Sequence, residues 1–145
     1  MEPFSLALQI RWSDLDPNFH LRHSVYYDWG ALCRIAFLNE RGLNADVMSR
    51  LHIGPILFRE ECVFRKEVRS DDSVSIDLKL SKAKADFSRW SIQHTILKSG
   101  NIVSAVLTVD GAWMNTVHRK LATPPANVHD VFSAMPRSKG FEWIG

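Results

Sequence analysis

The pattern of hydrophobic and polar positions changes along the chain, and each change marks a different kind of element. Residues 4–12 alternate between polar and apolar side chains and end on Trp12, which is typical of a β-strand. A polar stretch around Pro17 follows, and nearly every position from residue 24 to residue 41 then fits a helix. We therefore predict a strand, a polar loop and one long helix.

The predicted helix has almost no polar face. Only Asp28 and Arg34 interrupt the apolar run in its central part. A helix that is apolar all round must be buried all round in a soluble protein, and a small domain can achieve this if a sheet wraps the helix. Gly42 is suited to end the helix as a C-cap, and residues 44–51 fit a further short helix.

After Gly54 and Pro55 the hydrophobic period becomes two, which predicts a run of strands. The predicted strands cover residues 56–67, 74–80, 87–98 and 102–116. Ser99-Gly100-Asn101 is a strong hairpin signal, and a weak helical pattern lies near residues 126–134. Strands joined by hairpins form antiparallel sheets, with helices packed on one face. We therefore expect an α+β hotdog fold, in which a curved antiparallel sheet of about five strands wraps a long central helix.

Length and composition are those of one ordinary globular domain over residues 1–145. Apolar residues make up 46% of the chain and charged residues 23%, and the net charge is +2. This balance argues against nucleic acid as the main partner. The sequence shows neither a signal peptide nor a membrane-spanning run, so we expect a cytoplasmic protein in which Cys33 and Cys62 are reduced, buried thiols.

Reactive side chains are concentrated in the loop before the long helix. Asp14, Asp16, His20 and His23 all fall within this short segment. The unpaired N–H groups and the positive end of a helix can stabilise an oxyanion, and a nearby carboxylate can attack a carbonyl carbon or activate a water. The segment therefore favours attack on a carbonyl, with the amides near residues 22–24 as oxyanion donors.

The same segment resembles the hotdog-fold acyl-CoA thioesterases of the 4-hydroxybenzoyl-CoA thioesterase type. Their motif runs roughly aromatic-x-Asp-x-Asp-x-x-Gly-[His/Val/Ile]-Val-x-[Asn/His/Tyr]-x-x-Tyr. The residues that match or replace it here are Trp12, Asp14, Asp16, Phe19, His20, Leu21, His23 and Tyr26. The order of elements over residues 5–125 is also similar to that of the family.

The resemblance implies roles for individual residues. Asp16 occupies the place of the family's catalytic carboxylate, and His23 lies where a backbone amide polarises the thioester carbonyl in relatives. Asp14 is better suited to structural hydrogen bonding. Phe19 replaces the usual glycine, which permits positive φ and close backbone approach, so we expect it to narrow the acyl pocket, to change the turn or to alter the function.

Further candidates for catalysis and binding surround this motif. His20 and His23 could bind substrate or protonate the leaving thiolate, but structural histidines are equally common. We assign Phe19, Ser24, Tyr26, Tyr27, Glu60, Arg65 and Lys82 to substrate binding. Coenzyme A requires cations for its phosphates, and the candidates are Arg65, Lys66, Arg69, Lys82, Lys84, Arg119 and Lys120. No zinc-binding spacing is present, so we expect no metal.

Two polar residues fall on otherwise apolar strand faces. Glu60 lies among Phe58 and Cys62, and His94 lies between Ile92 and Ile96. A buried carboxylate is unfavourable unless it is paired, so the two could meet near a ligand site or a subunit interface. A β-bulge that turns either side chain outward is the simpler expectation.

The sequence therefore predicts an enzyme that hydrolyses an acyl-CoA or acyl-carrier-protein thioester without a cofactor beyond the coenzyme A of the substrate. Two alternatives remain: a non-catalytic module that binds acyl thioesters, and a hydratase or dehydratase acting on an acyl chain. Since an unpaired sheet edge is usually covered by association, we also expect a homodimer joined edge to edge, or a tetramer.

Overall fold

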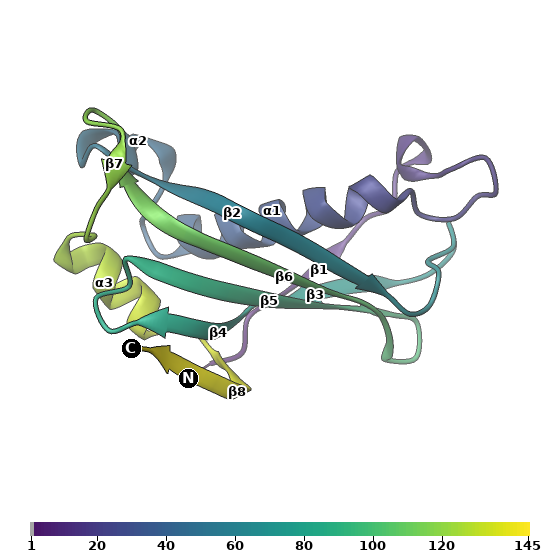
Figure 1. Cartoon of the computed structure of the whole chain (residues 1–145). Coiled ribbons are helices and arrows are strands. Elements are labelled where there is room, and N and C mark those ends of the chain that lie inside the picture. Colours follow the sequence, from purple (N-terminus) through teal and green to yellow (C-terminus); the bar gives the residue numbers. More distant parts are fainter. Residues whose placement is uncertain (1) are drawn as a thin grey trace.

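The computed structural model describes residues 2–145 and shows a curved sheet wrapped along one long helix (Figure 1). The helical segments are η1 (Trp12–Asp14), α1 (His23–Glu40), α2 (Ala45–Arg50) and α3 (Ala126–Ser133). The strands are β1 (Ser5–Leu8), β2 (Ile53–Phe64), β3 (Val74–Asp77), β4 (Lys79–Lys84), β5 (Arg89–Lys98), β6 (Ile102–Asn115), β7 (Lys120–Leu121) and β8 (Arg137–Ile144). The predicted hotdog arrangement is confirmed.

The sheet is built around β5. One edge of β5 pairs antiparallel with β6, which pairs in turn with β2. The other edge of β5 pairs with β3 and β4, which are separated at Leu78. The predicted strand over residues 74–80 is therefore interrupted, and it continues beyond its predicted end to Lys84. Beyond them, β1 pairs antiparallel with β3, and β8 runs parallel to β4. The chain therefore forms the expected five-strand sheet with additional short strands at its margins.

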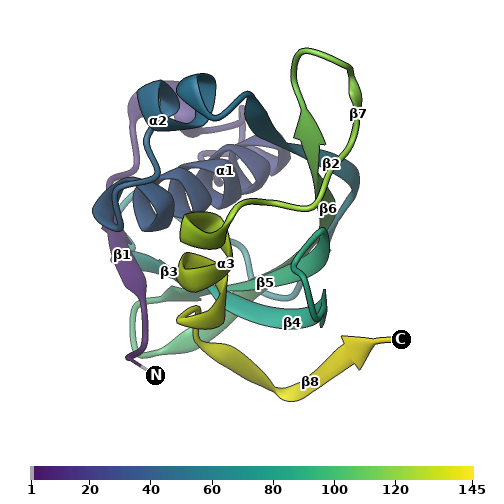
Figure 2. The same ribbon diagram turned by 90° about the vertical axis from the view of Figure 1, so that its left-hand side faces the viewer.

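Helix α1 lies along the concave face of the sheet, as the view along its axis shows (Figure 2). Its sheet-facing residues recur at helical spacing, and Val25, Trp29, Cys33 and Phe37 are all buried. The boundaries predicted from the hydrophobic pattern are correct within one residue at each end. The helix N-terminus therefore sits at the end of the sheet where the polar loop enters.

The prediction that α1 is buried on all sides is wrong for the single chain. Leu32 is 47% exposed and Ile35 is 37% exposed, and Asp28 and Ala31 on the same side are also exposed. The sheet wraps one side of the helix and leaves this stripe uncovered. An exposed apolar stripe of this kind is typical of a surface that contacts another molecule.

Strand β2 contains a β-bulge that the alternation of its sequence concealed. The register with β6 shifts between Leu57 and Arg59, so Phe58 is the additional residue and is 53% exposed. Beyond the bulge, Glu60 remains on the helix side, where its Oε2 lies 4.0 Å from Nη2 of Arg34. The expectation that a bulge turns the side chain outward is wrong for His94, which is fully buried, whereas Glu60 is exposed in the single chain.

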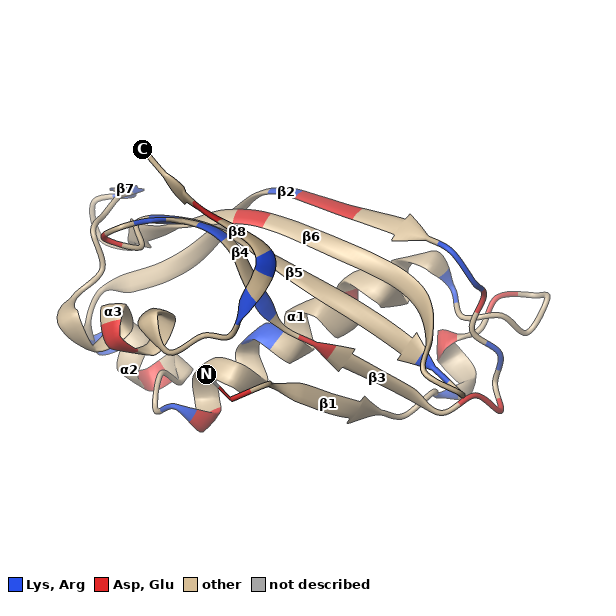
Figure 3. Ribbon diagram, turned by 90° about the horizontal axis from the view of Figure 1, so that it is seen from below, with Lys and Arg blue, Asp and Glu red and all other residues tan. Residues whose placement is uncertain are grey.

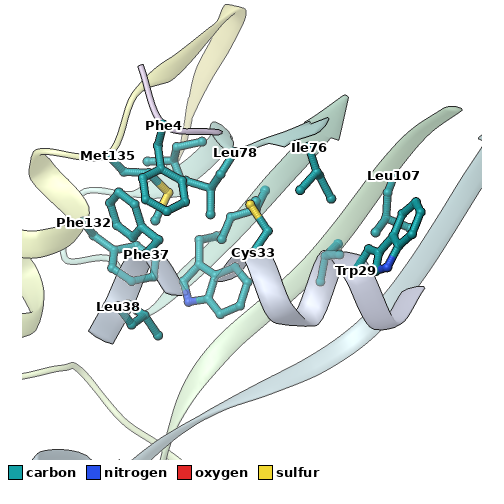
Figure 4. Packing of buried hydrophobic residues seen from close by; sticks show 14 of the residues in the cluster. Phe4, Trp29, Cys33, Phe37, Leu38, Ile76, Leu78, Leu107, Phe132 and Met135 are labelled. Atoms are coloured by element: carbon teal, nitrogen blue, oxygen red, sulfur yellow. The ribbon is translucent and has the colours of Figure 1, made fainter. Parts of the chain in front are cut away.

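The C-terminal segment closes the end of the sheet at which α1 terminates. Helix α3 confirms the weak pattern near residues 126–134, and its Phe132 ring lies 5.6 Å from the ring of Trp113. Phe132, Met135 and Phe37 form part of the buried cluster shown in Figure 4. Strand β8 was not predicted, because its sequence becomes a strand only against the edge of β4. This end of the molecule is consequently rich in aromatic side chains.

Candidate active site

The loop before α1 forms a tight turn around the carboxylate of Asp16. Oδ1 of Asp16 accepts the backbone N–H groups of Asn18 at 2.8 Å and of His20 at 3.1 Å. The backbone N–H of Asp16 donates to the carbonyl of His20 at 2.8 Å, and a bridge between Leu15 and Leu21 closes the loop. Among the described residues, Oδ2 of Asp16 has no hydrogen-bond partner. One carboxylate oxygen therefore fixes the turn and the other is available for chemistry.

Phe19 adopts a backbone conformation that favours glycine. Its φ is +62°, in the left-handed region that glycine adopts freely and other residues adopt at a cost of about 1–2 kcal/mol. Its ring is 57% exposed and lies 5.8 Å from the ring of Trp12. The ring is not among the side chains that line the pocket beside Asp16, which is described below. In the single chain, therefore, the Phe19 ring does not narrow this pocket.

We expect Phe19→Gly to leave kcat/KM within about threefold of the parent value, because the contacts of Asp16 are unchanged. Phe19→Val should lower both the melting temperature and kcat, since a β-branched residue is strained at positive φ. Steady-state kinetics and thermal unfolding of the two variants check this. A large loss of activity in Phe19→Gly would show that the ring itself contacts substrate.

Asp14 has the structural role expected of it. Its carboxylate is 1% exposed, accepts the backbone N–H of Arg11 at 2.9 Å and pairs with the Arg11 guanidinium at 2.8 Å. The hydrogen bond from the Arg11 side chain holds the pKa of Asp14 below its usual value. The carbonyl of Asp14 also accepts the N–H of Arg22, which fixes the entry to α1. Asp14 is therefore engaged inside the loop and does not face the pocket.

A polar pocket of about 280 Å³ lies beside Asp16, at the N-terminal end of α1. It is lined by Asp16, His20, Leu21, His23, Tyr26, Phe64, Arg65, Lys66 and Glu67. Tyr26 is buried and its ring meets that of Phe64 edge-on at 4.9 Å, and burial raises the pKa of the tyrosine. The pocket thus combines a carboxylate, two histidines and two cations around an aromatic pair.

Glu67 is a pocket residue that the sequence analysis missed. Its Oε2 lies 3.5 Å from Nδ1 of His20, close enough to pair with the protonated imidazole. The contact depends on backbone pairing between distant segments, in which Leu21 N–H donates to the carbonyl of Val68 and His20 forms a bridge with Arg69. No local sequence pattern signals such a contact.

The start of α1 offers backbone donors to this pocket. Arg22 is the N-cap residue and provides no side-chain cap. Within residues 2–145, the N–H groups of His23 and Ser24 have no acceptor, whereas that of Val25 donates to the carbonyl of Arg22. Free N–H groups at the positive end of a helix stabilise a developing negative charge. Of the three predicted oxyanion donors, the N–H of Arg22 is occupied by the carbonyl of Asp14. The N–H groups of His23 and Ser24 are free, and only His23 lines the polar pocket.

A second cavity, of about 240 Å³, lies toward the other end of α1 and is almost entirely apolar. Its walls are Ala31, Arg34, Ile35, Phe37, Leu38, Pro55, Leu57, Leu78, Trp90, Ile92, Trp113, Phe132 and Met135. Arg34 is the one charged residue among them. From His23 to Arg34 the helix advances roughly 16 Å at 1.5 Å per residue. We call this space the apolar cavity and the one beside Asp16 the polar pocket.

A buried polar network holds Arg34 against the sheet. Its Nη1 donates to Nε2 of His94 at 3.1 Å, and the other ring nitrogen of His94 lies 2.8 Å from the carbonyl of Asp77. Burial lowers the pKa of His94 to about 4, so the imidazole is neutral at physiological pH. Arg34 thus links His94 to Glu60, the two polar strand residues that the sequence singled out.

The structure brings together only part of the predicted site. Asp16, His20, His23, Tyr26 and Arg65 line the polar pocket, together with Lys66. The predicted binding residues that line neither space are Phe19, Ser24, Tyr27, Glu60 and Lys82. Lys82 lies on β4, in register with β8. Figure 3 shows charged residues in loops, along β4 and in the middle of β2, whereas β5 and β6 are nearly free of them.

The cysteines are free thiols that are poorly suited to nucleophilic attack. Burial raises the pKa of Cys33 to about 12 and that of Cys62 to about 11, so neither forms thiolate near neutral pH. In the part of the chain that the structure describes, no three His, Cys, Asp or Glu residues are grouped to hold a metal ion.

Comparison with known proteins supports the fold. A family model described as the thioesterase-like superfamily matches residues 10–132. No curated protein matches the sequence. Among the described residues, no helix has both the length and the apolar character needed to cross a membrane.

Three solved structures share the fold at low sequence identity. A Staphylococcus aureus protein solved in complex with CoA has a TM-score of 0.84 and 15% identity, covering 95% of this chain and 89% of its own. The 1,4-dihydroxy-2-naphthoyl-CoA thioesterase from Synechocystis has a TM-score of 0.81 and 15% identity, covering 92% and 97%. An Aquifex aeolicus protein has a TM-score of 0.80 and 19% identity, covering 89% and 98%. With the family model matched over most of its length, the chain belongs to the thioesterase-like superfamily.

Proposed function

We propose that this protein hydrolyses an acyl-CoA thioester, using Asp16 as its catalytic carboxylate. The observation that carries the proposal is the shared location of the Asp16 carboxylate and the first residue of α1, which line the same pocket. A thioester carbonyl placed there has the Asp16 carboxylate on one side and the free N–H group of His23 as an oxyanion donor. Arg65 and Lys66, at the same pocket, are available to the phosphates of coenzyme A.

Two routes use this arrangement. In the first, Asp16 removes a proton from a water, the hydroxide adds to the carbonyl carbon, and the C–S bond breaks to release the thiolate. In the second, Asp16 itself adds to the carbonyl carbon, the thiolate leaves, and water hydrolyses the resulting anhydride. In both routes water is consumed and the products are a carboxylate, the thiol and a proton.

The direct test is to incubate the protein with a panel of acyl-CoAs and a thiol reagent. Release of thiol in proportion to enzyme supports hydrolysis. Binding of acyl-CoA without release of thiol would instead show an acyl-thioester binding module. The main argument for that alternative was the replacement of glycine by Phe19; against it, Phe19 adopts a φ of +62°, which glycine also adopts freely.

We further propose that the enzyme is a homodimer joined along β2. Within the described chain, β2 pairs with β6 only, which leaves a twelve-residue edge open. Four apolar side chains on this strand are exposed: Leu57, Phe58, Val63 and Phe64. A long apolar edge is an association site unless it is covered, and the exposed stripe on α1 supports the same interpretation.

Two-fold antiparallel pairing of β2 would also bring the two spaces together. Pro55 and Leu57, at the start of β2, border the apolar cavity, and Phe64, at its end, borders the polar pocket. In an antiparallel pair the start of one strand lies beside the end of the other. Each polar pocket would therefore lie next to the partner's apolar cavity, which could hold the acyl tail.

The dimer is expected to sediment as a single species at micromolar concentration. Val63→Arg places a charge on the open edge and should shift the protein toward monomer and lower its activity. Val117→Arg is the matched control, because Val117 is 61% exposed in a turn outside β2. A stable monomer with full activity in the parent protein would overturn the proposal.

A further inference from the structure

The apolar cavity contains more hydrogen-bond donors than the protein satisfies. The indole nitrogens of Trp90 and Trp113 are buried and have no partner among the described residues, and both tryptophans line this cavity. Arg34 lines it as well, and its one hydrogen bond in the described chain runs from Nη1 to His94. Buried polar groups are nearly always paired, so two unpaired indole N–H groups at one cavity, beside a guanidinium with a single hydrogen bond, require an explanation.

The donors share one chemical property. An indole N–H and a guanidinium can only donate hydrogen bonds. His94 accepts a hydrogen bond from Arg34 through one ring nitrogen, and its other ring nitrogen lies against the carbonyl of Asp77. Neither nitrogen is therefore left to accept a hydrogen bond from the tryptophans. Glu60 lies 4.0 Å from Nη2 of Arg34, beyond hydrogen-bond distance, and does not line the cavity. What the cavity lacks is an acceptor.

We propose that the apolar cavity binds the distal part of the acyl group, and that this part carries oxygen acceptors for Arg34, Trp90 and Trp113. The inference rests on the proposed thioesterase function and narrows its substrate class to acyl groups with an oxygenated tail. The surrounding walls of Ile35, Leu38 and Phe132 accommodate the carbon skeleton. In the proposed dimer, the tail would enter the partner's copy of this cavity.

Binding of non-hydrolysable thioether analogues of acyl-CoA separates this inference from catalysis. Three analogues of equal carbon number would be compared by calorimetry, ending in a methyl group, a hydroxyl or a carboxylate. Hydrogen bonds to a charged group contribute about 1.5–3 kcal/mol, which corresponds to about 10- to 100-fold in Kd. We expect at least one oxygen-ended analogue to bind about 10-fold or more tightly than the methyl-ended one.

Variants identify the donor. Arg34→Met should reduce the preference for the oxygen-ended analogue by about 10-fold or more, and Trp113→Phe by a smaller factor of about 2- to 10-fold. Glu60→Gln should favour the carboxylate-ended analogue selectively, because it removes a negative charge near Arg34. Arg50→Gln is the matched control, because it also removes one cation but lies on the exposed surface of α2. It should leave the ratio of the Kd values of the methyl-ended and oxygen-ended analogues unchanged.

Each outcome decides the proposal. Equal or tighter binding of the methyl-ended analogue, or a ratio that Arg34→Met does not change, would overturn it. Because the readout is a ratio of Kd values, partial unfolding of a variant does not mimic the effect. A preference for oxygen-ended analogues without cleavage of the matching thioesters would retain this inference and refute the hydrolase. Cleavage of acyl-CoA without a preference for oxygen-ended analogues would support the hydrolase and refute this inference.

Discussion

Replacing Asp16 by asparagine is expected to lower kcat by about 10²- to 10⁴-fold, the usual contribution of a positioned acid or base. Asparagine retains a side-chain oxygen that can accept the N–H groups of Asn18 and His20, so the turn should survive. The amide that replaces Oδ2 can neither attack a carbonyl carbon nor remove a proton from water. KM should change little, because the binding groups at the polar pocket are intact.

Asp14→Asn is the matched control for this experiment. Asp14 is ionised, buried and paired with Arg11, so its replacement should lower the free energy of unfolding by about 1–3 kcal/mol. Its effect on kcat should be small at a temperature where the variant is folded. Thermal unfolding and steady-state kinetics on both variants separate the two roles. A hydratase would retain much of its activity in Asp16→Asn, and such a result would refute the hydrolytic mechanism.

Trp113→Ala is expected to reduce the free energy of unfolding by about 3–5 kcal/mol, as large-to-small core substitutions of aromatic residues do. Trp113 is fully buried on β6 and packs edge-on against Phe132 of α3. Its loss enlarges the apolar cavity and removes one of the aromatic contacts of α3. Since the free energy of unfolding of a small domain is only about 5–15 kcal/mol, this substitution would remove a large part of it.

Trp12→Ala provides the matched comparison. Trp12 is 79% exposed and its one aromatic neighbour in the described chain is Phe19, so the expected change is within about 0.5 kcal/mol. Denaturant unfolding followed by circular dichroism measures both variants without relying on tryptophan fluorescence. Similar losses of stability in the two variants would show that the burial of Trp113 has been overestimated.

The local sequence was sufficient to predict the main elements. Helix α1, the hairpin at Gly100 and α3 were predicted from periodicity and turn residues, because these depend on neighbours in the chain. The motif around Asp16 also lies within one short segment, so its turn and the adjacent helix start were predictable together. Both expectations used interactions that span only a few residues.

Interactions between distant segments were not predictable in this way. The bulge at Phe58 keeps Glu60 on the helix side, yet the sequence alternates smoothly across it. Glu67 reaches His20 only because the loop after β2 pairs with the loop before α1. The strand β8 forms only because the edge of β4 is available to it.

The amino-acid sequence by itself determined the hotdog order of elements, the long apolar helix and the carboxylate at its start. Periodicity, capping and turn preferences act over a few residues, so the chain carries this information locally. The tertiary structure alone decided which side of α1 stays uncovered, which polar groups surround Asp16 and where the apolar cavity with Arg34 and the two unpaired indoles lies. These depend on register and packing between segments far apart in the chain, where one bulge changes which side chains face inward.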